Sequence, residues 1–315
     1  MTRPLLRVLV TGAGGFVGRH IVGALLAHDC DVIALDRAFD ADLTGVWGDK
    51  VTRIESDAAD LPDVQVNAVI HAAAITASPE KLDLTPEAHL RANLDPALKV
   101  LEWAAGRKAR VVLMSSSAVF NDGSPQGKSE SHPITPTGTY GIAKAALEHI
   151  AQTWVDSYGR DVVCVRLSSI YGEGELVRSS RPVMSLVARY VEEALTRGEI
   201  GVDDPNFARD WTYAPDIGEA IYGLLQYERL QHSLYNLASE QVRTTLQIAE
   251  AIQKHLPNTQ ISIHGDERDV MRPIQRGYLL NPRLTDEIGF TAWTPFEDGI
   301  ARVVADAQQR MELNS

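Results

Sequence analysis

A glycine-rich turn between a buried strand and a helix constrains the fold of this chain more than any other feature. Residues 11–18 read TGAGGFVG and follow the apolar run 6–11, which is typical of a strand covered on both faces. Glycine lets the backbone approach a pyrophosphate, whose charge is held by N–H groups at the start of a helix. The turn therefore predicts a dinucleotide site. Its residues are Gly12, Gly14, Gly15, Phe16, Val17 and Gly18.

Short β-branched runs alternate with helical patterns up to about residue 170. The expected strands are 6–11, 32–36, 51–55, 68–71, 110–114 and 162–167, and the expected helices are 20–28, 86–105 and 140–158. Strands that alternate with helices form right-handed crossovers and a parallel sheet with helices on both faces. The predicted class is α/β, a doubly wound Rossmann sheet.

After Gly172 the regular alternation decays. Helices are expected at 182–197, 216–227, 245–255 and 295–309, and strands at 234–238 and 260–264. We expect a dinucleotide-binding domain over residues 1–172 and a smaller substrate-binding α/β lobe over residues 173–315. One strand or helix of the second part could return to the first sheet.

Composition narrows the classes of function. The chain has 315 residues, and 30 Lys and Arg against 42 Asp and Glu give a net charge of −12. No basic run interrupts this acidity, which argues against nucleic-acid or membrane-surface partners. No apolar run is long enough to span a membrane, and Cys30 and Cys164 fit neither a disulfide framework nor a zinc site. We expect a cytoplasmic protein without a metal, its two cysteines in the core.

An acidic residue ends the second expected strand, 18 residues beyond Gly18. Asp36 at this place accepts hydrogen bonds from the adenosine ribose and repels a 2′-phosphate, which favours NAD over NADP. The neighbouring Arg37 weakens this preference, because a guanidinium pairs well with a phosphate. NAD is the predicted cofactor.

A tyrosine and a lysine stand four residues apart at the start of an expected helix. Tyr140 and Lys144 therefore share one face. A nearby ammonium favours the phenolate, which can take a hydroxyl proton while hydride leaves the same carbon. The strand 110–114 leads into Ser115, Ser116 and Ser117, where a hydroxyl can hold the reacting oxygen.

Ten segments in order resemble the extended short-chain dehydrogenase/reductase family, which contains sugar epimerases, dehydratases and reductases. They are TGAGGFVG (11–18), the strand end at Asp36, SDAAD (56–60), HAAA (71–74), RANLDPALKVLEWA (91–104), MSSSAVF (114–120), YGIAK (140–144), RDWTYAPD (209–216), YNLAS (235–239) and TPFEDGI (294–300). The resemblance covers nearly the whole chain.

The resemblance implies a cofactor site and a catalytic set. Near the cofactor it places Asp57, Ala58, Ala72, Ala73, Ala74 and Asn93, the last as a support for the proton pathway. It makes Tyr140 the general acid/base, with Lys144 lowering its pKa and bonding the nicotinamide ribose. Ser116, three residues before Val119, is the implied catalytic hydroxyl, with Ser117 second. It also implies a homodimer through helices 86–105 and 140–158.

The chain departs from these enzymes where the substrate binds. Dehydratases and decarboxylases carry an acid just after the catalytic hydroxyl, but Ser117 and Ala118 stand here, which disfavours elimination. Ser169 replaces the Asn typical of sugar-nucleotide enzymes. Further candidates for the substrate site are the phosphate-binding match Arg209 and the loop arginines Arg178 and Arg181, which could clamp a small anion.

Two functions therefore remain open. The first is an NAD-dependent oxidoreductase that acts on a secondary hydroxyl of a sugar, a sugar acid or a related polyol. The alternative is a nucleotide-sugar 4-epimerase that retains its NAD.

Overall fold

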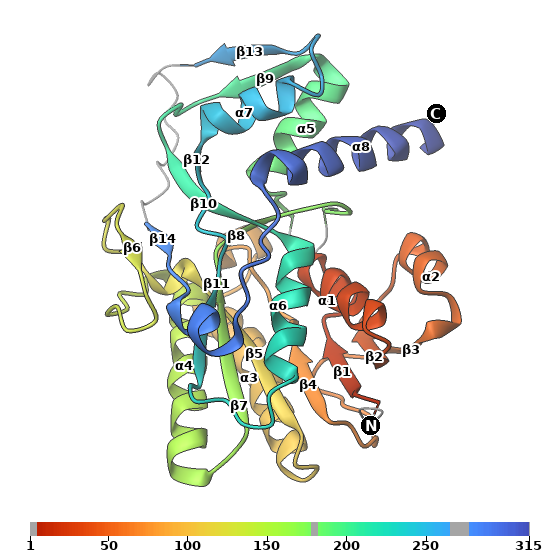
Figure 1. The fold of residues 1–315 in the computed structure, drawn as a ribbon, viewed down its shortest axis with the longest axis vertical. Coiled ribbons are helices and arrows are strands. Elements are labelled where there is room, and N and C mark those ends of the chain that lie inside the picture. Colours follow the sequence, from red (N-terminus) through yellow and green to blue (C-terminus); the bar gives the residue numbers. More distant parts are fainter. Residues whose placement is uncertain (1–4, 178–181, 265–276, 315) are drawn as a thin grey trace.

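A seven-stranded parallel sheet forms the centre of the molecule (Figure 1). The computed structural model describes residues 5–177, 182–264 and 277–314. The strand order is β11-β7-β5-β4-β1-β2-β3, and each adjacent pair is parallel. The strands are β1 (Arg7–Thr11), β2 (Asp31–Asp36), β3 (Val51–Glu55), β4 (Ala68–His71), β5 (Arg110–Ser116), β7 (Val162–Leu167) and β11 (Leu234–Leu237). The predicted doubly wound α/β class is confirmed.

Helices cover both faces of the sheet (Figure 1). Helices α1 (Phe16–Ala27) and α6 (Ala214–Leu225) pack on one face, and α3 (Pro86–Ala105) and α4 (Gly138–Tyr158) pack on the other. Alternate strand residues enter the two cores: Val8 and Val10 face α1, and Leu9 faces α3. A short helix, α2 (Ala41–Trp47), follows β2 and contributes the buried Trp47 to the α1 side. This helix was not among those expected from the sequence.

Two elements from the second half of the chain join the first sheet. Strand β11 pairs with β7, and α6 packs against α1, where a Cβ on Gly218 would lie 2.7 Å from the backbone oxygen of His20. The later half therefore closes one edge of the sheet and covers part of one face.

A smaller lobe lies beyond the carboxyl ends of the strands (Figure 1). Its helices are α5 (Leu186–Arg197), α7 (Thr245–Gln253) and α8 (Phe296–Asn314), which share one apolar core. Its strands are β8 (Ser169–Tyr171), β10 (Ala208–Tyr213) and β12 (Val242–Thr244) in one sheet, and β9 (Glu199–Val202) with β13 (Gln260–Ile263) in another. A third pair, β6 (Gly127–Lys128) and β14 (Tyr278–Leu279), lies beside it.

Several element boundaries differ from those expected, for local reasons. Helix α5 begins at Leu186 and not at 182, because Ser185 Oγ accepts the N–H of Ala188 at 3.2 Å and caps the helix there. Helix α1 begins four residues earlier than expected, directly after the glycine turn. Strand β5 continues two residues further, to Ser116. Both Cys30 and Cys164 are buried free thiols, as expected. No described helix is long and apolar enough to cross a membrane.

Candidate active site

The turn between β1 and α1 brings segments of backbone into close contact. Gly12 has a φ of 70°, and a Cβ on it would lie 2.5 Å from the backbone nitrogen of Ala73. A Cβ on Gly18 would lie 2.0 Å from the carbonyl oxygen of Gly12. The N-cap residue of α1 is Gly15, which has no side chain, so no side chain caps the N–H groups at the start of this helix. A turn walled by backbone at the start of a helix fits the pyrophosphate of a dinucleotide.

The acidic residue at the end of β2 is bonded to this turn. Asp36 Oδ2 accepts the N–H of Gly14 at 2.9 Å, and Oδ1 accepts the N–H of Arg37 at 2.7 Å. The side chains of Arg37 and Asp57 are exposed, and Ala58 is half-buried. The N–H of residue 56 donates to the backbone oxygen of Asp36 at 2.9 Å, so the ends of β2 and β3 meet where the adenosine half was expected.

The end of β4 forms the next wall. His71 Nδ1 lies 2.8 Å from Thr11 Oγ1, and burial lowers the pKa of His71 to about 3. The imidazole is therefore neutral and packs between strands. Ala72 and Ala74 line the central cavity, while the backbone of Ala73 contacts Gly12.

Asn93 uses its amide to support the loop after β4. Its Oδ1 accepts the N–H of Ile75 at 3.0 Å, and its Nδ2 donates to the oxygens of Ile75 at 3.2 Å and His89 at 3.1 Å. Asn93 is buried, and the partners of its side-chain amide are backbone groups of Ile75 and His89. Its direct effect is therefore on the position of the loop.

The three consecutive serines face different surroundings. Ser115 also belongs to the lining of the cavity, but its Oγ donates to the buried carboxylate of Glu148 at 2.5 Å. Ser116 and Ser117 both line the cavity, and Ser116 Oγ accepts the N–H of Ala118 at 3.2 Å. The geometry removes Ser115 from consideration and leaves Ser116 and Ser117 as the candidate hydroxyls.

Helix α4 brings the tyrosine and the lysine to the same place. A Cβ on Gly141 would lie 2.6 Å from the oxygen of Ala118, so the start of α4 packs directly on the turn after Ser116. Lys144 Nζ lies 5.5 Å from the centre of the Tyr140 ring. Burial of Lys144 lowers the pKa of its ammonium to about 8. The charge stays next to the phenol at neutral pH.

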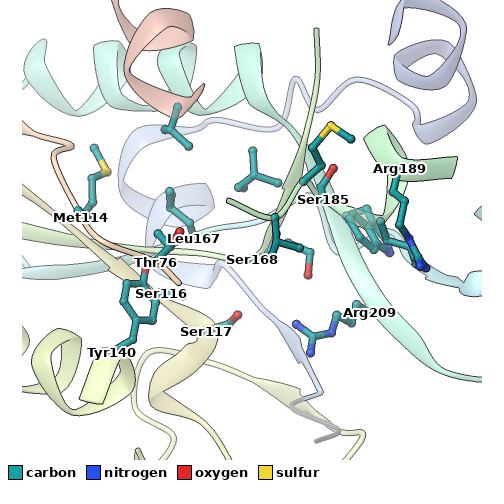
Figure 2. A pocket seen from close by; sticks show the side chains of 18 of the residues that line it. Thr76, Met114, Ser116, Ser117, Tyr140, Leu167, Ser168, Ser185, Arg189 and Arg209 are labelled. Carbon is teal, nitrogen blue, oxygen red and sulfur yellow. The ribbon is translucent and has the colours of Figure 1, made fainter. Parts of the chain in front are cut away.

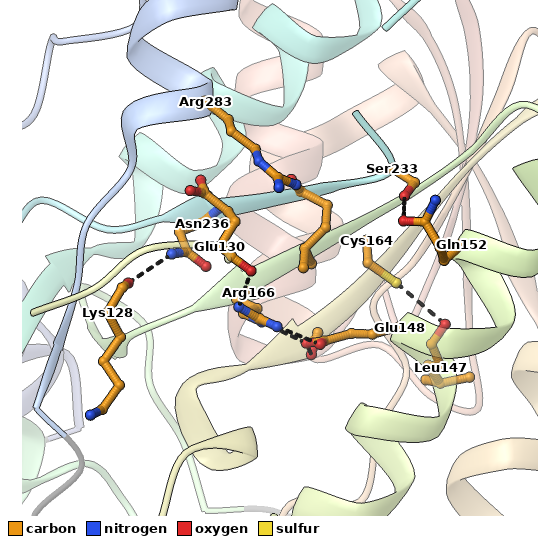
Figure 3. Close-up of polar contacts among 12 residues, drawn as sticks. Lys128, Glu130, Leu147, Glu148, Gln152, Cys164, Arg166, Ser233, Asn236 and Arg283 are labelled. Atoms are coloured by element: carbon orange, nitrogen blue, oxygen red, sulfur yellow. Dashed lines mark hydrogen bonds and ion pairs between the residues drawn. The ribbon is translucent and has the colours of Figure 1, made fainter. Parts of the chain in front are cut away.

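A buried ion pair connects α4 to the central sheet (Figure 3). Arg166 on β7 donates to Glu148 on α4 through Nε at 2.8 Å and Nη2 at 2.7 Å. Because Glu148 also binds Ser115, the pair ties the end of β5 to the helix that carries Tyr140. This network was not among the features expected from the sequence.

The lobe supplies the other wall. Ser169 and Arg209, which the sequence analysis named as candidates for the substrate site, line the cavity. Arg178 and Arg181 lie outside the described residues, so their role stays a prediction. Trp211 is buried in the lobe core and also lines the cavity; its Nε1 has no acceptor among the described residues.

Residues after β4, the serines at the end of β5, the Tyr140–Lys144 pair of α4 and residues of the lobe surround one cavity of about 870 Å³. Figure 2 shows Tyr140, Ser116 and Thr76 at one end of it and Arg189 and Arg209 at the other. Two carboxylates, Asp203 and Asp204, belong to the described lining and follow β9 in the lobe. No group of three His, Cys, Asp or Glu in the described part of the chain could hold a metal ion.

Sequence reasoning missed several lining residues, including Thr76, Lys81 and Arg189. None of the three stands in a chemical motif, and each reaches the cavity through folding of distant elements. The position of Thr76, two residues after Ala74, was the one local signal that could have been used.

Known proteins share this architecture and much of its sequence pattern. UDP-glucuronic acid decarboxylase 4 of Arabidopsis thaliana is 26% identical over 99% of this chain and 70% of its own length. A putative UDP-glucose 4-epimerase of Methanocaldococcus jannaschii is 25% identical over 94% of this chain and 97% of its own. The Thermotoga maritima UDP-glucose 4-epimerase, solved with UDP-glucose, shares the fold with a TM-score of 0.83 at 19% identity, covering 97% of this chain and 100% of that one.

The profile of the NAD dependent epimerase/dehydratase family matches residues 8–238, which is most of the chain. The matched residues include the glycine turn, Asp36, the serines of β5 and the Tyr140–Lys144 pair. On this match, supported by the fold, the chain is an enzyme that belongs to the NAD-dependent epimerase/dehydratase family.

Proposed function

We propose that this protein is an NAD-dependent epimerase of a nucleotide-linked sugar. It would oxidise a secondary alcohol carbon and reduce it again from the other face. The observation that carries this proposal is the chemistry of the cavity near Tyr140, where the described lining offers a phenol, an ammonium and hydroxyls. Elimination needs an acid or base at a second carbon, and Ala118 follows the serines instead. Of the two functions left open by the sequence, the epimerase is favoured.

The far end of the cavity supports a nucleotide as the handle of the sugar. Arg189 and Arg209 are donors suited to a diphosphate, which offers only acceptors. Asp203 and Asp204 are acceptors suited to ribose hydroxyls and base N–H groups. A nucleoside diphosphate presents both kinds of group. The cavity volume lies near the upper end of the roughly 300–1,000 Å³ of ligand sites, as an extended substrate requires.

The glycine turn and Asp36 support NAD as the cofactor. The turn has no space for side chains near the expected pyrophosphate, and the Asp36 carboxylate is held beside the expected ribose by the N–H of Gly14. When bound, NAD supplies the acceptor and later the donor of hydride.

The chain's own residues move the proton and hold the substrate oxygen. Tyr140 takes the hydroxyl proton in the oxidising step and returns it in the reducing step, so one residue serves both directions. Lys144 stabilises the phenolate through its charge. The Ser116 hydroxyl, beside Tyr140 in Figure 2, donates to the reacting oxygen.

The first test measures the cofactor and the product together. Freshly purified protein is denatured, and the NAD and NADH released per chain are quantified by chromatography. The native protein is then incubated with UDP-glucose, UDP-galactose or UDP-glucuronate and followed by proton NMR and NADH absorbance. An epimerase retains near-stoichiometric NAD and forms the epimer without net NADH.

Other products would contradict the proposal. Net NADH with an oxidised sugar would establish the dehydrogenase, and loss of water or CO₂ would establish elimination or decarboxylation. Tyr140→Phe should lower turnover by about 10²–10⁴-fold and leave bound NAD unchanged. The matched control is Tyr158→Phe, an exposed tyrosine at the other end of α4, which should keep full activity.

A further inference from the structure

A short loop after β8 lies against the helix that follows the cofactor turn. We call residues 172–175 the junction loop. Nε2 of His20, on the second turn of α1, lies 3.0 Å from the backbone oxygen of Glu173. A Cβ on Gly174 would lie 2.6 Å from Nη1 of Arg19, also on α1. The position of the junction loop is therefore set by the first two turns of α1.

The junction loop also contacts the strand that carries one of the two cavity arginines. The hydroxyl of Tyr213, the last residue of β10, donates to a carboxylate oxygen of Glu173. The Tyr213 side chain is buried, so this contact lies inside the protein. Arg209 stands four residues earlier on the same strand and lines the cavity. The strand of Arg209 is thus tied to the loop that rests on α1.

The last residue of the junction loop fixes the start of α5. Oε1 of Glu175 accepts the N–H of Ser185 at 2.7 Å, and Oε2 accepts the Ser185 hydroxyl at 2.5 Å. The Ser185 oxygen in turn accepts the N–H of Ala188 at 3.2 Å, as the N-cap of α5. A serine caps a helix through its own oxygen and needs no carboxylate to do so. The buried Glu175 therefore adds a fixed position and orientation to the cap.

The cap determines the place of the second cavity arginine. The N–H of Arg189 donates to the backbone oxygen of Ser185 at 3.0 Å, so the arginine stands one turn after the cap. Its guanidinium carbon lies 5.2 Å from the ring centre of the buried Tyr190. Arg189 and Ser185 line the cavity, whereas Glu175 is not among the described lining residues. Any effect of Glu175 on a ligand in the cavity must therefore pass through the residues that it holds.

We infer that Glu175 is a positioning residue for the nucleotide end of the substrate, because through Ser185 it holds Arg189 at a fixed place relative to α1. This inference rests on the proposed function and adds to it a residue outside the cavity on which substrate affinity depends. A guanidinium that is already in place loses less conformational entropy when it binds a diphosphate. The junction loop gives Arg189 and Arg209 a common reference on α1, so the spacing between the cofactor turn and both arginines is set before the substrate binds.

The test measures the binding of a nucleotide that undergoes no reaction. UDP is titrated into the NAD-loaded protein by calorimetry, and KM and kcat are measured for any UDP-sugar that is converted. Glu175→Gln keeps the size of the side chain but replaces one acceptor oxygen by an amide donor. It should raise the Kd of UDP and the KM about five- to tenfold, as expected when a charged hydrogen bond is weakened, and leave kcat and bound NAD unchanged. Glu192→Gln, which removes the same charge from an exposed position on α5, is the control.

A double-mutant cycle separates positioning from a general loss of structure. In a protein that carries Arg189→Met, adding Glu175→Gln should not weaken UDP binding further, because its effect passes through the arginine. Ser185→Ala is the second variant, which keeps the backbone bond of 2.7 Å and tests the inference even if Glu175→Gln does not fold. It should raise the Kd of UDP by a smaller factor, and this increase should also vanish in the Arg189→Met background.

The outcomes distinguish this inference from the proposed function. An unchanged Kd of UDP in Glu175→Gln and Ser185→Ala would overturn the inference and leave the epimerase in place. Equal effects with and without the Arg189 side chain would also overturn the inference, because Glu175 would then act on structure alone. Weaker UDP binding that depends on Arg189, in a protein that forms no epimer, would support the inference and contradict the epimerase. A wild type that does not bind UDP would overturn both.

Discussion

The backbone N–H of Gly14 donates a hydrogen bond of 2.9 Å to Asp36 Oδ2. This bond joins the glycine turn to the end of β2, two segments that each contribute to the expected cofactor site. The carboxylate is held before any ligand arrives, and its other oxygen is oriented by the N–H of Arg37 at 2.7 Å. The same residue therefore shapes the turn and lies where the adenosine ribose is expected.

Replacing Asp36 should weaken the binding of NAD and reduce the preference for NAD over NADP. Asp36→Ala removes the ribose acceptor and leaves the Gly14 N–H without its partner, so we expect the Kd of NAD to rise at least tenfold. The ratio of NAD to NADP affinity should fall towards one, because the repulsion of a 2′-phosphate is lost. Calorimetry with both cofactors measures this. Asp31→Asn, at the other end of β2, should change neither affinity, and an unchanged NAD Kd in Asp36→Ala would contradict the assignment.

Two glycines of α1 provide a matched pair for the cofactor turn. A Cβ on Gly18 would lie 2.0 Å from the oxygen of Gly12, whereas a Cβ on Gly23 meets nothing within 4 Å. Gly18→Ala should displace the turn and abolish NAD retention. Gly23→Ala should retain NAD and stabilise the protein by up to about 1 kcal/mol, because alanine is the better helix former. Released NAD per chain and thermal unfolding test both; normal NAD content in Gly18→Ala would show that the turn tolerates the change.

Burial of Lys144 should make stability depend on pH in the NAD-free protein. The pKa of Lys144 is lowered to about 8 in the folded state, whereas the pKa of a lysine in the unfolded chain is about 10.4. Between these values the unfolded chain binds a proton that the folded chain has lost, so the free energy of unfolding rises with pH from about 8 to 10. Below pH 8 the buried ammonium costs on the order of 3 kcal/mol.

The methionine variant isolates this contribution. Lys144→Met should be more stable than the wild type at pH 7, by roughly 1–3 kcal/mol, and should lose this part of the pH slope. Urea unfolding of the NAD-free proteins at several pH values gives the comparison, with Lys99→Met as the exposed control. A less stable Lys144→Met at pH 7 would mean that the ammonium is stabilised by its surroundings.

The buried ion pair of Arg166 and Glu148 should contribute far more to the free energy of unfolding than an exposed ion pair. Arg166→Met leaves the Glu148 carboxylate buried without its cation, and we expect a loss of about 3–5 kcal/mol in unfolding free energy. Lys99→Met breaks the exposed pair with Glu102 and should cost less than about 1 kcal/mol. Chemical denaturation measures both. Similar losses in the two variants would refute the structural role of the buried pair.

Features that depend on short stretches of chain were predictable. The glycine turn, the acid that ends β2 and the four-residue spacing of Tyr140 and Lys144 each depend on local geometry. Strand and helix patterns located all seven strands of the main sheet, including the segment at 234–238. The return of that segment to the first sheet was left open, because a period of two shows that a strand exists but not which strand it joins.

The sequence by itself therefore determined the Rossmann class, the place of the cofactor turn and the helix that carries Tyr140. Only the tertiary structure decided that the Ser115 hydroxyl is bonded to Glu148, which leaves the hydroxyls of Ser116 and Ser117 as the candidates in the cavity. It alone brought Lys81 and Arg189 to the same cavity. The reason is physical: strand alternation and helix caps act over a few residues, whereas the cavity is assembled from crossovers and a lobe whose approach depends on packing across the whole chain.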